Sequence, residues 1–187
     1  MKKNPLFFIA LLPPPGIQAE VTQFKNFIAG HWAARHALKS PPHLTLIPPF
    51  EWPTNELAQL HAFLRDFAQK ESPFMLNLNG FGAFPPRVVF IEPKGAEGLG
   101  ALDGLFKRLI GAMKTTLDFD DPRNRRPYHP HMTIAHRDLA EEDFPAVWQH
   151  FKQENFVRRF PVRQISLLEL RAGLWNVCAD FPMGLAN

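Results

Sequence analysis

The sequence predicts an α+β domain built from two similar lobes. Short apolar runs alternate with amphipathic segments along the chain, and pairs of prolines separate several of them. A strand-like run led by proline and histidine occurs in the first third of the chain and again after its middle. Two related lobes would leave such a weak internal repeat. With 187 residues, we expect a single bilobal domain over residues 1–187 that has a substantial core.

The first third of the chain is expected to form two strands and two helices. Residues 6–12 are apolar and bounded by turn formers, which predicts a buried strand. Apolar side chains at helical spacing predict a helix over residues 16–37. Pro41-Pro42 favours an extended entry into a strand over residues 43–47, which Pro48-Pro49 ends. Thr54 can then cap a second helix that continues to about residue 70.

The remainder is expected to add further strands and two helices. Alternation predicts a strand over residues 74–79, and an apolar run predicts another over 87–92. A helix over 99–117 leads into a polar linker, 118–128, and then a strand over 131–135. Residues 141–155 are predicted to form a short helix, because they begin with acidic side chains that suit a helix N-terminus. Strands over 162–170 and 174–181, joined as a hairpin through Arg171-Ala172-Gly173, complete the prediction.

The composition excludes several classes of protein. A single cysteine, Cys178, excludes a disulfide framework and any multi-cysteine metal site. No apolar run approaches the roughly 18 residues that span a bilayer, so we expect no membrane partner. A net charge of +3 permits a nucleotide or RNA partner without demanding one.

The N-terminal segment has two interpretations, a cleaved signal peptide or the first strand of the fold. Met1-Lys2-Lys3 ahead of residues 6–12 is similar to a short signal peptide. The apolar run is at the lower length limit of such signals, and three prolines follow where a small-residue cleavage site belongs. A first strand, and a location in the cytoplasm, are therefore favoured over a cleaved signal.

The most specific feature is a pair of near-identical pentapeptides, Pro42-His43-Leu44-Thr45-Leu46 and Pro130-His131-Met132-Thr133-Ile134. With 8 histidines and 6 threonines in the chain, one His-x-Thr arises by chance roughly 0.3 times, so a pair with shared flanks is informative. Side chains alternate across a strand, so each motif presents an imidazole and a hydroxyl on one face and apolar side chains on the other.

Two imidazoles and two hydroxyl groups facing each other suit in-line attack at phosphorus without a metal ion. One neutral imidazole can remove a proton from water while one imidazolium protonates the leaving oxygen. Histidine serves both roles because its ordinary pKa of about 6.5 lies near neutrality. The threonine hydroxyls can donate hydrogen bonds to non-bridging phosphate oxygens.

These paired motifs resemble those of the 2H phosphoesterase superfamily. The wider chain is similar to the LigT-type branch, the 2′-5′ RNA ligases and RNA 2′,3′-cyclic phosphodiesterases. The likeness covers the apolar first strand, both pentapeptides, and the Gly-Phe-Gly-Ala-Phe-Pro stretch at residues 80–85 with the strand after it. It implies two pseudo-symmetric lobes of mostly antiparallel sheet, with helices packed outside and the active-site cleft between the lobes.

The resemblance also implies roles for the motif residues. It makes His43 the proton donor and His131 the proton acceptor, with Thr45 and Thr133 holding the phosphate. Members of the LigT-type branch often carry a basic residue soon after the second motif. Here the chain continues as Ala135-His136-Arg137, so Arg137 is the expected equivalent.

Other residues near the motifs have both a functional and a structural interpretation. Three aromatic residues could stack on a base or simply pack in the core, namely Phe50, Phe84 and Tyr128. Three linker arginines could contact a nucleic-acid backbone or lie on a solvated loop, namely Arg123, Arg125 and Arg126. Four histidines on helical segments are expected to be structural or superficial, namely His31, His36, His61 and His150.

A metal site is the alternative use of the remaining histidines. His129 and His131 would share a strand face, and His136 follows shortly after. No nearby carboxylate completes a set of ligands, so we expect no metal and no other cofactor.

The leading hypothesis is a metal-independent phosphodiesterase that hydrolyses 2′,3′-cyclic phosphates of RNA ends or small nucleotides to 2′-phosphates. The resemblance adds 2′-5′ RNA ligation by the same site, and we expect a monomer. Two alternatives remain: a non-catalytic protein that binds RNA ends or nucleotides, and a metal-dependent phosphohydrolase.

Overall fold

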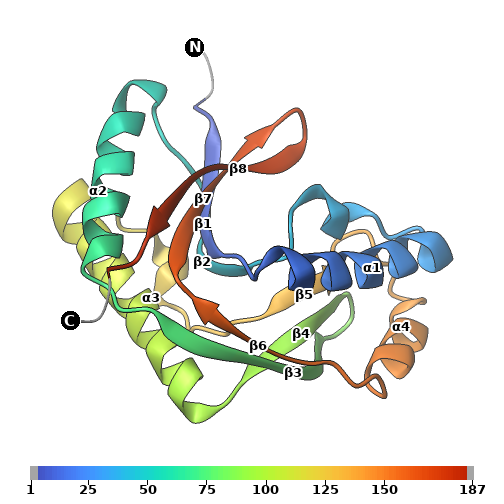
Figure 1. Cartoon of the computed structure of the whole chain (residues 1–187). Coiled ribbons are helices and arrows are strands. Elements are labelled where there is room, and N and C mark those ends of the chain that lie inside the picture. The colour runs from blue at the N-terminus through green and yellow to red at the C-terminus, as the bar shows by residue number, and fades with distance from the viewer. Residues whose placement is uncertain (1–3, 185–187) are drawn as a thin grey trace.

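Two four-stranded antiparallel sheets form the centre of the molecule. The computed structural model describes residues 4–184 (Figure 1). The first sheet has the strand order β2-β1-β7-β8 and the second the order β5-β4-β3-β6, with every neighbouring pair antiparallel. The strands are β1 (Leu6–Leu11), β2 (Leu44–Glu51), β3 (Phe74–Phe84), β4 (Val88–Lys94), β5 (Met132–Ala135), β6 (Val157–Val162), β7 (Gln164–Arg171) and β8 (Leu174–Pro182). The expected α+β class with two mostly antiparallel sheets is confirmed.

Four helices flank these sheets, with α2 and α3 on one side and α1 and α4 on the other (Figure 1). They are α1 (Pro15–Trp32), α2 (Leu57–Gln69), α3 (Ala96–Leu117) and α4 (Phe144–Phe151). Helix α1 leaves β1 of the first sheet but packs on β5 of the second, and α2 packs on β8. Helix α1 thereby ties the two sheets together.

The two halves of the fold place the His-x-Thr motifs in equivalent positions. In each sheet the motif strand, β2 or β5, lies at one edge and pairs with the strand that precedes it in the chain, β1 or β4. A long helix, α1 or α3, joins the two strands of each pair. The repeat seen in the sequence therefore corresponds to a repeated strand–helix–strand unit.

Several element boundaries differ from the sequence-based expectation. The helix expected over residues 16–37 ends at Trp32, because Ala33 adopts a left-handed conformation with φ 54°. A short 3-10 helix, η1 (His36–Lys39), follows it. The expected helix over 141–155 is shorter, while the helix expected from residue 99 begins at Ala96.

The segment after α4 holds one more strand than expected. Strand β6 pairs with β3 in the second sheet, and β7 pairs with β1 in the first. The prediction missed β6 because its first three residues, Val157–Arg159, are exposed and two of them are arginines, so no apolar alternation marks it. The hairpin expected through Arg171-Ala172-Gly173 joins β7 and β8, with positive φ at Ala172 and Gly173.

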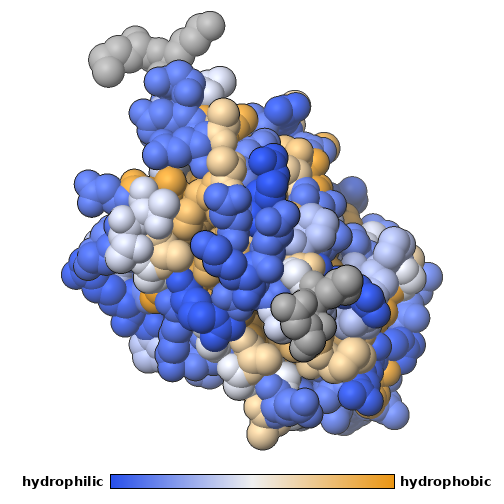
Figure 2. Space-filling model, turned by 60° about the vertical axis from the view of Figure 1, so that its left-hand side comes forward, coloured by the Kyte–Doolittle hydropathy of each residue, from blue (hydrophilic) through white to orange (hydrophobic). Residues whose placement is uncertain are grey.

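One large hydrophobic core runs through both sheets and beneath the helices. A small second cluster, made of Phe8, Ala10 and Leu168 with Leu12 and Trp175 packed against it, lies apart from this core. The surface on the α2 and α3 side is mostly hydrophilic, with narrow apolar strips (Figure 2). Within residues 4–184 no helix combines the length and hydropathy that a membrane crossing needs.

Candidate active site

The two His-x-Thr motifs meet in one cleft between the sheets. The cleft has a volume of about 500 Å³, and His43, Thr45, His131 and Thr133 all line it. Strand β2 with the residue before it presents the first pair, and β5 with the residue before it presents the second. Neither threonine hydroxyl makes a hydrogen bond to another residue in the described part of the chain. The fold thus brings together two imidazoles and two available hydroxyl donors from segments about ninety residues apart.

Each motif histidine is held by the same local hydrogen bond. Nδ1–H of His43 donates to the carbonyl oxygen of Pro41 over 2.7 Å, and Nδ1–H of His131 donates to that of His129 over 2.7 Å. A carbonyl oxygen only accepts, so Nδ1 must carry the proton in both rings. Nε2 of each ring is therefore the nitrogen left to take or give a proton.

Aromatic side chains from the neighbouring strand hold both imidazole rings. The centroid of Phe8 lies 4.7 Å from that of His43, and the centroid of Phe90 lies 5.3 Å from that of His131. Phe8 belongs to β1 and Phe90 to β4, the strands that pair with the motif strands. A Cβ on Gly82 would overlap the Phe90 ring, so the glycine allows Phe90 to lie against β3 in this position.

Burial favours the neutral form of both motif histidines. It lowers the pKa of His43 to about 4, and the positive charge of Lys25 lowers it further. Burial also lowers the pKa of His131, although its hydrogen bond to the His129 carbonyl acts in the opposite direction. In the free protein at neutral pH, both Nε2 atoms therefore carry a lone pair.

A group of basic side chains forms one wall of the cleft, namely His36, Lys39, His136 and Arg137. The rings of His36 and His136 meet edge to face with centroids 4.8 Å apart. Burial lowers the pKa of His136 to about 4, and burial also lowers that of His36. Arg137 was expected near the site and lies in this wall. His36, which was expected to be structural or superficial, also lies in this wall.

The carboxylate of Asp138 joins the two parts of this basic wall. It accepts hydrogen bonds from the backbone N–H groups of Arg35 and His36, each 2.7 Å long. These contacts tie the start of η1 to the loop that follows β5. The positions of His36 and His136 are therefore set relative to each other.

Lys25 is a buried residue near the site that the sequence analysis did not single out. Its side chain is 2% exposed, and Nζ donates to the carbonyl oxygens of Ala37 and Ser40, each over 3.0 Å. Burial lowers its pKa to about 8. Its position on the same helical stripe as Val21 and Ile28 was the available signal, since a lysine on an apolar stripe needs buried partners.

Two of the three aromatic residues that could stack on a base or pack in the core are engaged in packing. Phe50 is 4% exposed and packs in the core against Phe7 and Trp52, so it does not line the cleft. The Tyr128 ring stacks on Phe106 with centroids 4.1 Å apart, and its hydroxyl donates to the Thr45 carbonyl over 2.9 Å. Burial raises the pKa of this hydroxyl.

Phe84, the third of these residues, lies next to the site but outside the cleft lining. It is 37% exposed and its ring meets that of His131 edge to face, with centroids 5.3 Å apart. Phe84 therefore contacts the His131 ring without lining the cleft, and it lines a neighbouring cavity instead.

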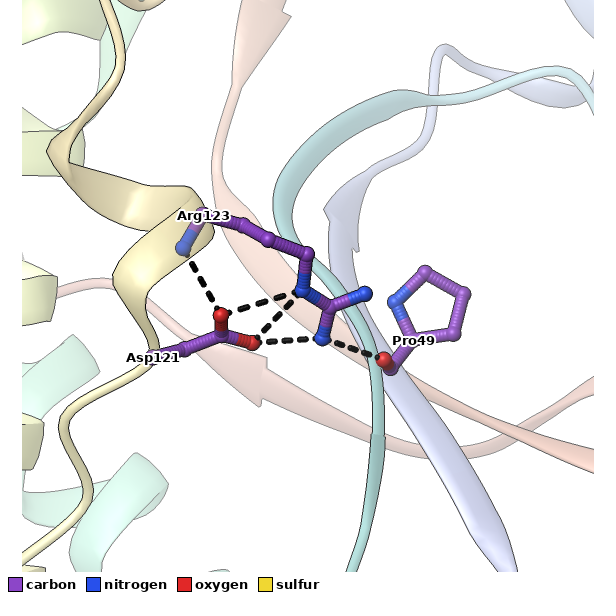
Figure 3. Close-up of polar contacts among 3 residues, drawn as sticks. All are labelled: Pro49, Asp121 and Arg123. Carbon is purple, nitrogen blue, oxygen red and sulfur yellow. Dashed lines mark hydrogen bonds and ion pairs between the residues drawn. The ribbon is translucent and has the colours of Figure 1, made fainter.

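The linker arginines have different environments. Arg123 pairs with Asp121 and donates Nη2–H to the Pro49 carbonyl over 2.8 Å, which clamps the linker onto β2 (Figure 3). Arg125 pairs with Asp120 at 2.8 Å. Arg126 lines a cavity of about 150 Å³ that shares Thr45 and His131 with the main cleft.

The donor set at the cleft is one of imidazoles, hydroxyls and cationic side chains. In residues 4–184, no three histidine, cysteine, aspartate or glutamate side chains are grouped so that they could hold a metal ion. Two cationic side chains, Lys39 and Arg137, and the two threonine hydroxyls in the lining are groups that suit an anionic ligand.

Comparison with known proteins identifies the family. The sequence model of the 2′-5′ RNA ligase superfamily matches residues 13–174. A protein of Oceanobacillus iheyensis named "Putative phosphoesterase" is 30% identical over 181 residues, covering 94% of this chain and 96% of that protein. One of the same description from Bacillus pumilus is 30% identical over 150 residues, covering 77% of this chain and 80% of that protein.

Solved structures share the fold over nearly their whole length. TT0787 of Thermus thermophilus aligns with a TM-score of 0.69 at 23% identity, covering 97% of this chain and 100% of that one. Escherichia coli LigT, solved with 3′-AMP, aligns with a TM-score of 0.65 at 20% identity, covering 97% and 99%. The family match, the relatives and the paired motifs agree, and the chain belongs to the 2′-5′ RNA ligase superfamily, the 2H phosphoesterases.

Proposed function

We propose that the protein is a metal-independent phosphodiesterase that hydrolyses 2′,3′-cyclic phosphates of RNA ends or nucleotides to 2′-phosphates. The observation that carries this proposal is the matched pair of histidines in one cleft, each with Nδ1 bound to a carbonyl and Nε2 left for proton transfer. Membership of a ligase and phosphoesterase superfamily supports it. The binding of 3′-AMP by LigT, which has the same fold, supports a ribonucleotide substrate.

In the proposed reaction, the Nε2 atom of His131 removes a proton from water as the water oxygen attacks phosphorus. The bond between phosphorus and O3′ breaks, and Nε2–H of His43 protonates O3′ as it leaves. Thr45 and Thr133 donate hydrogen bonds to the non-bridging oxygens, where negative charge concentrates. The products are a 2′-phosphate and a free 3′-hydroxyl. Attack by an RNA 5′-hydroxyl in place of water gives a 2′-5′ phosphodiester by the same proton transfers.

The acid in this mechanism must be protonated when substrate binds. Burial keeps His43 neutral in the free protein at neutral pH. A phosphate anion placed beside the ring favours imidazolium and raises the pKa, since opposite charges a few ångströms apart stabilise each other. Substrate binding and protonation of the acid are therefore coupled in the proposal.

Replacement of either motif histidine tests the mechanism. His43→Ala and His131→Ala are each expected to lower the turnover of a 2′,3′-cyclic nucleotide by a factor of about 10²–10⁴, the usual contribution of one proton transfer. His150→Ala, on the exposed side of α4, is the matched control and is expected to keep wild-type turnover. Circular dichroism establishes that the variants fold. Unchanged turnover in a folded His43 or His131 variant would contradict the mechanism.

The same assay separates the alternative functions. Product carrying the phosphate at the 2′ position, formed equally with and without EDTA, is the outcome expected here. Binding of cyclic-phosphate RNA without any product would instead support a non-catalytic binding protein. Loss of turnover in EDTA, restored by a divalent metal, would support a metal-dependent phosphohydrolase.

A further inference from the structure

We infer that the cleft face of the first sheet beside His43 is a nucleobase subsite, with Trp175 as its stacking platform. The inference rests on the proposed function, because it states how a nucleotide would lie in the same cleft. Phe8 and Leu170 form the apolar surface next to Trp175. None of these three residues was a site candidate from the sequence.

The cleft has two walls of different chemistry. One wall is basic and comes from η1 and the loop after β5, through His36, Lys39, His136 and Arg137. The other is apolar and comes from β1, β7 and β8, through Leu6, Phe8, Leu170 and Trp175. The two His-x-Thr motifs line the same cleft. A nucleotide has the same division, with an apolar π face on its base and negative charge on its phosphate.

Strand register explains why the apolar side chains share one face of the sheet. Phe8 of β1 lies opposite Leu168 of β7, and Leu170 of β7 lies opposite Trp175 of β8. Residues directly opposite in antiparallel strands project to the same side, and so do residues two apart in one strand. These side chains therefore form a continuous strip that extends from β1, the strand next to His43, to β8 at the sheet edge.

Trp175 is available to a ligand. Its side chain is half-buried, and it lines both the main cleft and a smaller cavity of about 220 Å³. Its indole N–H donates no hydrogen bond to any residue between 4 and 184. The ring meets Phe8 edge to face with centroids 4.7 Å apart, and Phe8 in turn lies 4.7 Å from His43. A base held at Trp175 thus has its ribose directed toward the motif histidines.

This arrangement distinguishes substrates that carry a base from those that do not. Stacking of a base on an aromatic side chain lowers the dissociation constant about ten- to a hundred-fold. Nucleoside 2′,3′-cyclic phosphates are therefore expected to bind much more tightly than a cyclic phosphate of glycerol. Because every base has a π face, the preference among bases is expected to be weak.

Three variants test the subsite. Trp175→Ala removes the platform, Trp175→Phe keeps a smaller one, and Val177→Ala is the control. Val177 lies two residues further along β8 and is 40% exposed, but it does not line the cleft. Trp175→Ala is expected to raise KM for adenosine 2′,3′-cyclic phosphate about tenfold or more while leaving glycerol 1,2-cyclic phosphate unaffected. Trp175→Phe is expected to restore part of the loss, and Val177→Ala is expected to match wild type.

Equilibrium binding separates this inference from the proposed activity, since it needs no turnover. The dissociation constants of 2′-AMP and inorganic phosphate are measured by calorimetry for wild type and the three variants. Trp175→Ala is expected to weaken 2′-AMP about tenfold or more and to leave phosphate unchanged. An equal loss for both ligands, or no loss for 2′-AMP, overturns the base subsite. Absence of hydrolysis with this binding pattern intact would instead overturn only the proposed function.

Discussion

Buried polar contacts of single residues determine which atoms the cleft presents. The carbonyl groups of Pro41 and His129 accept hydrogen bonds from Nδ1 of the motif histidines and leave Nε2 of each ring without such a partner. Each carbonyl belongs to the residue just before a motif proline, Pro42 or Pro130, where backbone conformation is restricted to extended forms. The proline in each motif thus contributes to the orientation of the imidazole of the next residue, His43 or His131, in addition to its effect on the backbone.

At the residue scale, Lys25→Met is expected to change both stability and the titration of His43. Methionine preserves the apolar stem but leaves the carbonyl groups of Ala37 and Ser40 without their buried donor, at a cost of about 1–3 kcal/mol in the free energy of unfolding. Loss of the Lys25 charge is expected to raise the pKa of His43 above about 4.

Urea denaturation and an NMR titration of the His43 ring measure these two effects. Lys70→Met, at the exposed end of α2, is the control for the loss of one lysine charge. A pKa of His43 that does not move in Lys25→Met, or that moves equally in Lys70→Met, would show that Lys25 has no electrostatic influence on the site.

At the scale of elements, the linker over residues 118–128 connects the strands that carry the two motifs. It leads directly into the second motif, and two contacts attach it to β2, which carries the first. One is the clamp from Asp121 through Arg123 to the Pro49 carbonyl, and the other is the bond from the Tyr128 hydroxyl to the Thr45 carbonyl. Both motifs are therefore held in one structural unit, although they lie in different sheets.

Arg123→Met is expected to lower turnover more than it lowers stability. Exposed ion pairs contribute little to the free energy of unfolding, about 1 kcal/mol or less. Loss of the clamp removes one of the two attachments of the linker to β2, however, and leaves the bond from the Tyr128 hydroxyl to the Thr45 carbonyl. Small displacements of reacting groups lower catalytic rates strongly. We expect kcat for a 2′,3′-cyclic nucleotide to fall several-fold.

The neighbouring arginine offers a matched control for this prediction. Arg125 also pairs with an aspartate, Asp120, but in residues 4–184 it makes no hydrogen bond to β2. Arg125→Met is therefore expected to retain wild-type kcat. Equal kcat values for the two variants would indicate that the clamp does not position the site.

At the scale of the whole molecule, the sequence predicts the repeated architecture better than the walls of the cleft. Short-range signals are sufficient for the strand–helix–strand units, because proline pairs and apolar periodicity mark their ends and buried faces. The same signals place His43, Thr45, His131 and Thr133 on the polar faces of their strands. The facing of the two motifs across one cleft, by contrast, was expected from the resemblance to a family.

What the sequence does not predict depends on tertiary contact. Trp175 and Phe8 become cleft residues only through the register between β1, β7 and β8, and His36 only because Ala33 ends α1 and η1 turns back. Phe50 and Tyr128 are close to the motifs in sequence, but Phe50 packs against Phe119 in the core, and Tyr128 stacks on Phe106 and lines the adjoining cavity of about 150 Å³ rather than the cleft. Sequence proximity to a motif is thus a weak guide to the lining of a cleft between two sheets.

The stability of the whole molecule is expected to fall on mild acidification, because the cleft between the sheets contains buried neutral histidines. The pKa of His43 and that of His136 are both lowered to about 4 in the folded protein, from about 6.5 when unfolded. The unfolded chain therefore binds more protons between these values. The stabilising contribution is complete above pH 6.5 and is lost as the pH falls toward 4.

Replacement of one cleft histidine tests this pH dependence. His136→Gln is expected to reduce the loss in the free energy of unfolding between pH 7.5 and pH 5 by about 1 kcal/mol, after allowance for solvent screening. Urea denaturation at the two pH values measures the difference between variant and wild type, in which the titration of carboxylates cancels. His150→Gln, on the outer helix α4, is expected to follow the wild type, and the same pH dependence in all three proteins would contradict a role for the cleft histidines.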